Sequence, residues 1–166
     1  ILYNMQFLHE HLLIFSQISL VCLTLSISGF LLKKFLIGHE DKNNFEENGL
    51  LGYISVGFIA LLINFFFSLN LLVNNLFLIL VILLGFKFHF FNQKKINLLK
   101  KIIIISLIAY IFIIYSNINR PDAFLYHLPY SKILTEDKII FGLTNLHSRF
   151  GHISIYQYIS SIYVNS

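Results

Sequence analysis

The residues best suited to chemistry are concentrated in one polar segment near the C-terminal end of the sequence, between residues 117 and 152. This segment holds a carboxylate, a phenol, an arginine and three imidazoles, namely Asp122, Tyr126, His127, His147, Arg149 and His152. A carboxylate within hydrogen-bonding reach of a hydroxyl can remove its proton as a general base. An arginine fork can bind a phosphate or pyrophosphate group through two parallel hydrogen bonds. These are titratable groups and phosphate-type ligands of the kind that polar chemistry requires.

Asp122 has two interpretations that the spacing leaves open. It can act as a general base, or it can be a carboxylate at a helix start, favoured there by the helix dipole and paired with Arg120. Pro121 can occupy the first position of a short helix, which places Asp122 in the first turn and Tyr126 one turn later on the same face. We therefore predict a helix over about 122–134 that lies along the membrane surface.

Apolar side chains of this predicted helix are expected to enter the lipid headgroup boundary. They are Phe124, Leu125 and Leu128.

Arg149 and His147 are separated by one residue, so they face the same side if the segment is extended. Gly142 and Gly151 give the backbone around them extra freedom. The pair could hold a phosphate, or Arg149 could meet lipid headgroups. The histidines of the segment could in principle bind a metal, but their spacing matches no known ligand pattern.

Composition indicates that the surrounding elements lie in a membrane. Of 166 residues, 57% are hydrophobic and 12% are charged, and the mean hydropathy is +0.75, far from the usual soluble mix of about 25% charged residues. Most lysines flank apolar runs rather than forming a basic patch with interleaved aromatics, so nucleic acid is not an expected partner. The single cysteine, Cys22, excludes an internal disulfide and a cysteine-based metal site.

Apolar runs predict an all-α fold, a polytopic integral membrane helical bundle. It has about four complete transmembrane helices plus the start of a fifth. The fifth is expected to begin near Ser154, because Ser154 and Gln157 have capping-box spacing. The four complete spans are about 12–32, 50–69, 71–91 and 102–115.

The predicted organisation is four transmembrane helices over 1–116, an external loop with the candidate site over 117–152, and the start of the next transmembrane helix over 153–166. The sequence begins at Ile1, and its last residues lie within a predicted hydrophobic helix that has not yet ended. We expect it to be a fragment of a longer protein.

Lysines cluster in the loops after the first and third spans. By the positive-inside rule, these two loops face the cytoplasm. The N-terminal segment, the turn at Asn70 and the segment from Asn117 to His152 are then external. The clustered residues are Lys33, Lys34, Lys42, Lys87, Lys94, Lys95, Lys100 and Lys101.

Two stretches of the external segment resemble a known family. They read D-A-F-L-Y-H at Asp122–His127 and G-L-T-N-L-H-S-R-F-G at Gly142–Gly151. They resemble the first large external loop of a family of bacterial multi-spanning membrane proteins, which are similar to the GT-C class of glycosyltransferases. That class takes sugars from polyprenyl-phosphate carriers. The resemblance covers about 35 of the 166 residues.

The resemblance implies a role for each matching residue. Asp122 is the candidate base, and Tyr126 and His127 form its supporting shell. A second group, which handles the lipid phosphate, consists of Asn145, His147 and Arg149.

The resemblance also implies partners and a location. The partners are membrane lipids and a lipid-linked sugar, and the location is the bacterial cytoplasmic (inner) membrane. No cofactor is certain, although a divalent cation can replace arginine at the lipid phosphate. Phe150, His152 and Ile153 depart from the Leu and Phe-Asn expected around Gly151, which leaves the donor side less defined.

Two other function classes remain open. A transporter or flippase would need ionisable residues or broken helices inside its spans, and Asn64 with Gly57 is too little to define a pathway. A non-catalytic membrane subunit or assembly factor would use the polar loop only to bind a partner.

Overall fold

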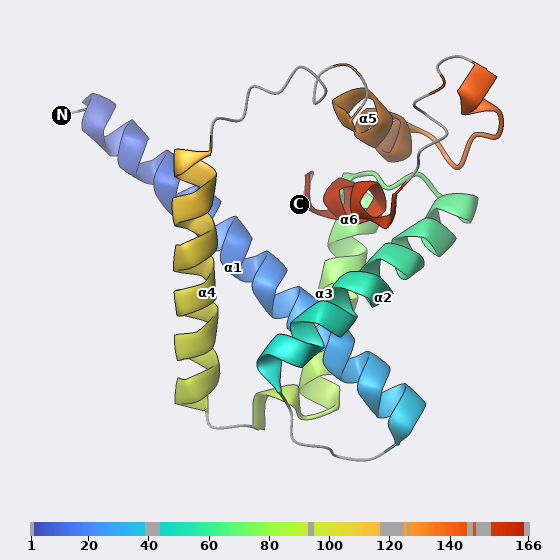
Figure 1. Ribbon diagram of the computed structural model, residues 1–166. Coiled ribbons are helices and arrows are strands. Elements are labelled where there is room, and N and C mark those ends of the chain that lie inside the picture. The colour runs from blue at the N-terminus through green and yellow to red at the C-terminus, as the bar shows by residue number, and fades with distance from the viewer. Residues whose placement is uncertain are drawn as a thin grey trace.

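The computed structural model describes residues 2–38, 44–92, 95–116, 125, 127–145, 148 and 154–164, and all regular structure in these ranges is helical. Figure 1 shows long helices crossing one another and the short helical segments after residue 127 gathered at one end. The α-helices are α1 (Leu2–Ile37), α2 (Phe45–Phe66), α3 (Leu71–Lys87), α4 (Lys95–Tyr115), α5 (Leu128–Glu136) and α6 (Ile155–Val164), with 3-10 turns η1 (Phe90–Asn92) and η3 (Leu143–Asn145).

Three of these helices are long and apolar enough to cross a membrane: α1 over His9–Leu36, α2 over Phe45–Phe66 and α4 over 97–115. Helix α3 is apolar but has 17 residues, which at 1.5 Å per residue covers about 26 Å of a hydrocarbon core about 30 Å thick. The predicted all-α membrane bundle is therefore confirmed, and the protein is a membrane protein.

Helices α1 and α2 cross at very short range because glycines face each other's backbone. A Cβ atom added at Gly29 would overlap the Asn48 carbonyl, and one added at Gly52 would overlap the Leu25 carbonyl. Small residues allow such close backbone approach between membrane helices, where van der Waals packing drives association. This crossing is the centre of the bundle (Figure 1).

Ion pairs join three helices at one end of the bundle. Lys33 of α1 lies 3.0 Å from Glu47 of α2, and Lys101 of α4 lies 2.9 Å from Glu46. The loops after the first and third predicted spans are both rich in lysine and are predicted to share one side of the membrane. These ion pairs place both of them at the same end of the bundle. We call this the lysine-rich end.

The turn between α2 and α3 lies at the opposite end, together with α5. The Leu69 N–H donates to the Leu134 carbonyl oxygen over 2.8 Å, and the Ile139 N–H donates to the Asn64 carbonyl oxygen over 2.9 Å. These bonds place the turn at Asn70 and the described part of the polar segment on one side, as the charge pattern predicts. We call this the loop end.

Helix α5 overlaps the predicted surface helix over 128–134 and continues two residues farther, to Glu136. The proline in its first turn is Pro129 rather than Pro121. Leu125 and Leu128 are both exposed. The rest of the predicted helix, residues 122–124 and 126, lies outside the described residues, as does Pro121.

Candidate functional site

The sequence-predicted site residues fall into two groups. Asp122, Tyr126, His147 and Arg149 lie outside the described residues, so their arrangement stays a prediction. His152 also lies outside them.

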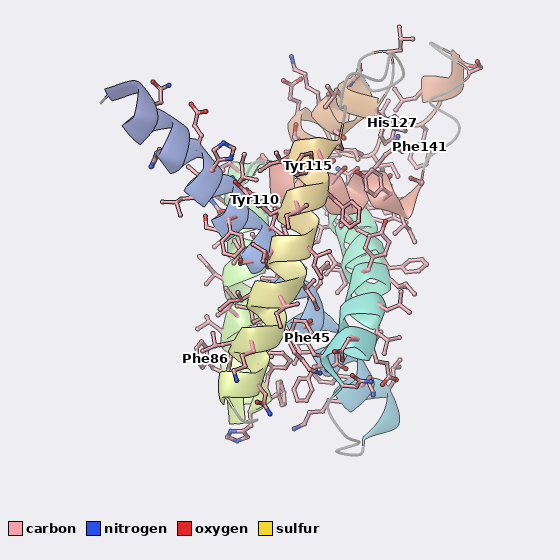
Figure 2. All side chains as sticks on the ribbon, turned by 60° about the vertical axis from the view of Figure 1, so that its left-hand side comes forward. Phe45, Phe86, Tyr110, Tyr115, His127 and Phe141 are labelled. Carbon is pink, nitrogen blue, oxygen red and sulfur yellow. The ribbon has the colours of Figure 1, made fainter. Side chains whose placement is uncertain are left out.

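His127 and Asn145 are described, and both are exposed. His127 has helical backbone and directly precedes α5, while Asn145 closes η3. Figure 2 shows His127 with Phe141 at the loop end, far from Phe45.

The amide of Asn64, a buried residue in the last turn of α2, helps to hold helix α5 on the bundle. Its Nδ2 donates to the carbonyl oxygens of Asp137 at 3.1 Å and of Leu134 at 3.4 Å. A third acceptor is the carbonyl oxygen of Phe67, at 3.4 Å. The last carbonyl groups of a helix have no partners within the helix, so Asn64 satisfies the C-terminal end of α5 and of its own helix together.

Asn74 of α3 carries a second buried amide, and this amide binds a backbone carbonyl group near the C-terminal end of α6. Its Nδ2 donates to the Leu69 carbonyl oxygen at 2.8 Å and to the Ser161 carbonyl oxygen at 2.9 Å. In lipid every backbone polar group needs a partner inside the protein, because water is absent. Asn74 therefore ties α6 to both α3 and the α2–α3 turn.

Helix α6 begins where the capping box predicts. The Ser154 N–H donates to Oε1 of Gln157 over 3.1 Å, and the helix runs from Ile155 to Val164. At its other end the hydroxyl groups of Tyr163 and Thr24 lie 2.9 Å apart, which links α6 to α1.

Gly57 of α2 makes room for α6. A Cβ atom added there would overlap the side chain of Ile155 and lie 3.2 Å from that of Ile159. Helix α6 therefore packs directly on the backbone of α2 and lies across it, as Figure 1 shows.

Two tyrosines meet where α5 packs on α6. Tyr130 and Tyr158 are each 2% exposed. Burial is the largest of the causes that raise the pKa of Tyr130 above its ordinary value. Because both rings are buried between α5 and α6, they form part of the contact between the two helices.

The structure thus reveals a layer of uncharged polar groups beneath the polar segment that sequence analysis had not assigned. The signal in the sequence is an amide within an apolar run, and by itself Asn64, with Gly57, is too little to define a transport pathway. In the described ranges no group of three or more His, Cys, Asp or Glu side chains could hold a metal ion. The layer consists of Thr24, Asn64, Asn74, Gln157 and Ser161.

Comparison with known proteins gives one finding. A family model described as "Domain of unknown function (DUF8201)" matches residues 12–166. No curated protein and no solved structure matches the chain.

Proposed function

The chain belongs to the DUF8201 family, and we propose that it is a membrane glycosyltransferase-like protein that transfers a sugar from a polyprenyl-phosphate donor to an acceptor. The reaction takes place on the external side of the bacterial cytoplasmic membrane. Its partners are the lipid-linked sugar, the acceptor and the surrounding membrane lipids.

One observation carries the proposal. Helix α5, which belongs to the described part of the polar segment, is fixed to the bundle at the end opposite the lysine-rich one, through the Leu69 to Leu134 hydrogen bond and the Asn64 amide. A lipid-linked donor has its phosphate at the membrane surface and its tail among the helices. A polar segment held at that surface can meet the phosphate, while the apolar bundle receives the tail.

The proposed reaction is a direct displacement. Asp122 removes the proton from the acceptor hydroxyl as its oxygen forms a bond to the anomeric carbon. The bond from that carbon to the donor phosphate breaks, and the phosphate leaves with the electron pair as a stable anion. The anomeric configuration is inverted, and no covalent enzyme intermediate forms.

The phosphate is held by the second group of residues. Arg149 supplies a two-pronged fork for the phosphate oxygens, with His147 and Asn145 as further donors. Tyr126 and His127 support Asp122. A divalent cation is the alternative partner for the phosphate, and it would replace part of the arginine's charge.

The transporter alternative gains no support from the described spans. Their buried polar side chains are serine, threonine and asparagine, and none of them is charged. The amides of Asn64 and Asn74 bind backbone carbonyl groups, which is a structural task. Ion-coupled pathways instead contain paired ionisable residues.

The test uses the full-length protein in membrane vesicles with a polyprenyl-phosphate sugar labelled in the sugar. A glycosyltransferase breaks the sugar–phosphate bond and moves the label to the acceptor. A flippase moves the intact lipid to the other leaflet and leaves that bond unbroken. Label that stays on the lipid, with acceptor present, contradicts the proposal.

A further inference from the structure

Two lysines from different helices converge on one aromatic ring at the lysine-rich end. Nζ of Lys34, in the last turn of α1, lies 5.3 Å from the centroid of the Phe88 ring. Nζ of Lys87, in the last turn of α3, lies 5.7 Å from the same centroid. Lys34 also lies 5.9 Å from the centroid of Phe30. Both ammonium groups therefore lie close to the same aromatic ring.

These two lysines differ from their neighbours in having no acidic partner within the described ranges. Lys33 is paired with Glu47, and Lys101 with Glu46. The negative end of a helix dipole favours a lysine in the last turn of each helix. That effect explains one lysine per helix, but it does not explain why both charges point to one ring.

Apolar surface adjoins the two charges. Phe35, 68% exposed, packs edge to face on Phe88 with 5.5 Å between ring centroids. Phe86, 61% exposed, stacks on Phe91 at 4.4 Å. A ligand that matches this surface has an anionic group for the ammonium groups and an apolar part for the rings. A phospholipid combines both, and the site lies at the end of α1, which is long and apolar enough to span a membrane, and at the end of the shorter apolar helix α3.

We propose that Lys34, Lys87 and the Phe88 ring form a binding site for the headgroup phosphate of an anionic phospholipid, whose acyl chains lie along Phe35 and Phe86. Basic residues where membrane helices end are suited to anionic headgroups, because the surface potential of such lipids concentrates there. This site is at the opposite end from the proposed transfer site and does not depend on it.

The test measures lipid binding to the full-length protein in detergent by native mass spectrometry, with phosphatidylglycerol and phosphatidylcholine as the probes. We expect the wild type to retain phosphatidylglycerol in preference to phosphatidylcholine. In the Lys34→Gln/Lys87→Gln variant the affinity for phosphatidylglycerol should fall about fivefold for each lysine. Equal retention of the two lipids by the wild type would overturn the proposal.

A control variant removes the same charge elsewhere. Lys100→Gln/Lys132→Gln changes two exposed lysines on α4 and α5 and should leave the preference intact, whereas an equal loss would show that only net charge matters. Lys34→Arg/Lys87→Arg keeps both charges and should retain binding, which separates a lost site from a misfolded protein. Soluble glycerol phosphate, offered as a competitor, should not displace the lipid; displacement at equal concentration would make this a site for free phosphate instead.

Discussion

The Leu69 N–H, in the turn between α2 and α3, donates to the Leu134 carbonyl oxygen near the end of α5, with 2.8 Å between nitrogen and oxygen. The two residues are far apart in the sequence, and their bond joins the hairpin of two apolar helices to the polar segment. With the Asn64 amide on the same carbonyl group, it fixes the position of α5 on the bundle. The proposed transfer site depends on this attachment.

Replacing Asn64 by alanine should destabilise the loop end. The change removes the donor to the Asp137 and Phe67 carbonyl groups, and the loss of an ordinary intramolecular hydrogen bond costs about 0.5–1.5 kcal/mol. The measurement is the thermal unfolding midpoint of the full-length protein in detergent. Asn75→Ala, at an exposed asparagine of α3, is the control. Equal midpoints for the two variants would show that the Asn64 bonds contribute nothing.

Replacing Gly52 by alanine should separate α1 from α2. The added Cβ would overlap the Leu25 carbonyl, whereas a Cβ at Gly49 would meet Ser26 Oγ at 3.7 Å, an ordinary contact. Overpacking of this kind costs about 1–3 kcal/mol and occasionally more. Unfolding of Gly52→Ala and Gly49→Ala in the same detergent checks the difference. A Gly49→Ala protein that is the less stable of the two would contradict the crossing.

The two loops at the lysine-rich end should face the cytoplasm. In a Cys22→Ala background, a single cysteine is introduced as Asn44→Cys, Asn97→Cys or Lys138→Cys, all at exposed positions. A membrane-impermeant maleimide added to intact cells should label only Lys138→Cys, and the other two should react after permeabilisation. Free labelling of either loop cysteine in intact cells would reverse the proposed topology.

The sequence predicts those parts of the fold that depend on local chemistry. The apolar runs predict the long helices, and the spacing of Ser154 and Gln157 predicts the start of α6, which the hydrogen bond between them confirms. Helix α2 begins at Phe45, earlier than the apolar run alone indicates, because Asn44 is extended and Glu46 and Glu47 lie in the first turn. Carboxylates there interact favourably with the helix dipole.

The sequence does not predict contacts between a side chain and a backbone carbonyl group on a distant part of the chain. Asn64 and Asn74 each bind carbonyl groups, and a carbonyl group carries no signature in the sequence. The sequence therefore does not distinguish an asparagine that binds a distant carbonyl group from one that has no structural role. For the candidate site, His127 and Asn145 are exposed as a ligand would require, while the roles of Asp122 and Arg149 stay predictions.

Replacing Arg149 by lysine should weaken donor binding. A point charge takes the place of a fork that holds two phosphate oxygens at once. We expect a higher KM for the polyprenyl-phosphate sugar, with a smaller change in kcat. Lys132→Arg, an exposed lysine of α5 with an ion pair to Glu136, is the control for a conservative exchange in the same segment. An unchanged KM in Arg149→Lys would remove the arginine from the donor site.

The most direct test of the proposed function is the rate of sugar transfer by Asp122→Asn in the full-length protein, measured with a synthetic polyprenyl-phosphate sugar. The amide keeps the size of the side chain but cannot accept the proton. Transfer should fall by about 10²-fold or more, the contribution of a positioned base, while donor binding and folding are retained. Asp137→Asn, which changes an exposed carboxylate at the end of α5, should transfer at the wild-type rate. Unchanged turnover in Asp122→Asn would contradict the assignment of the base.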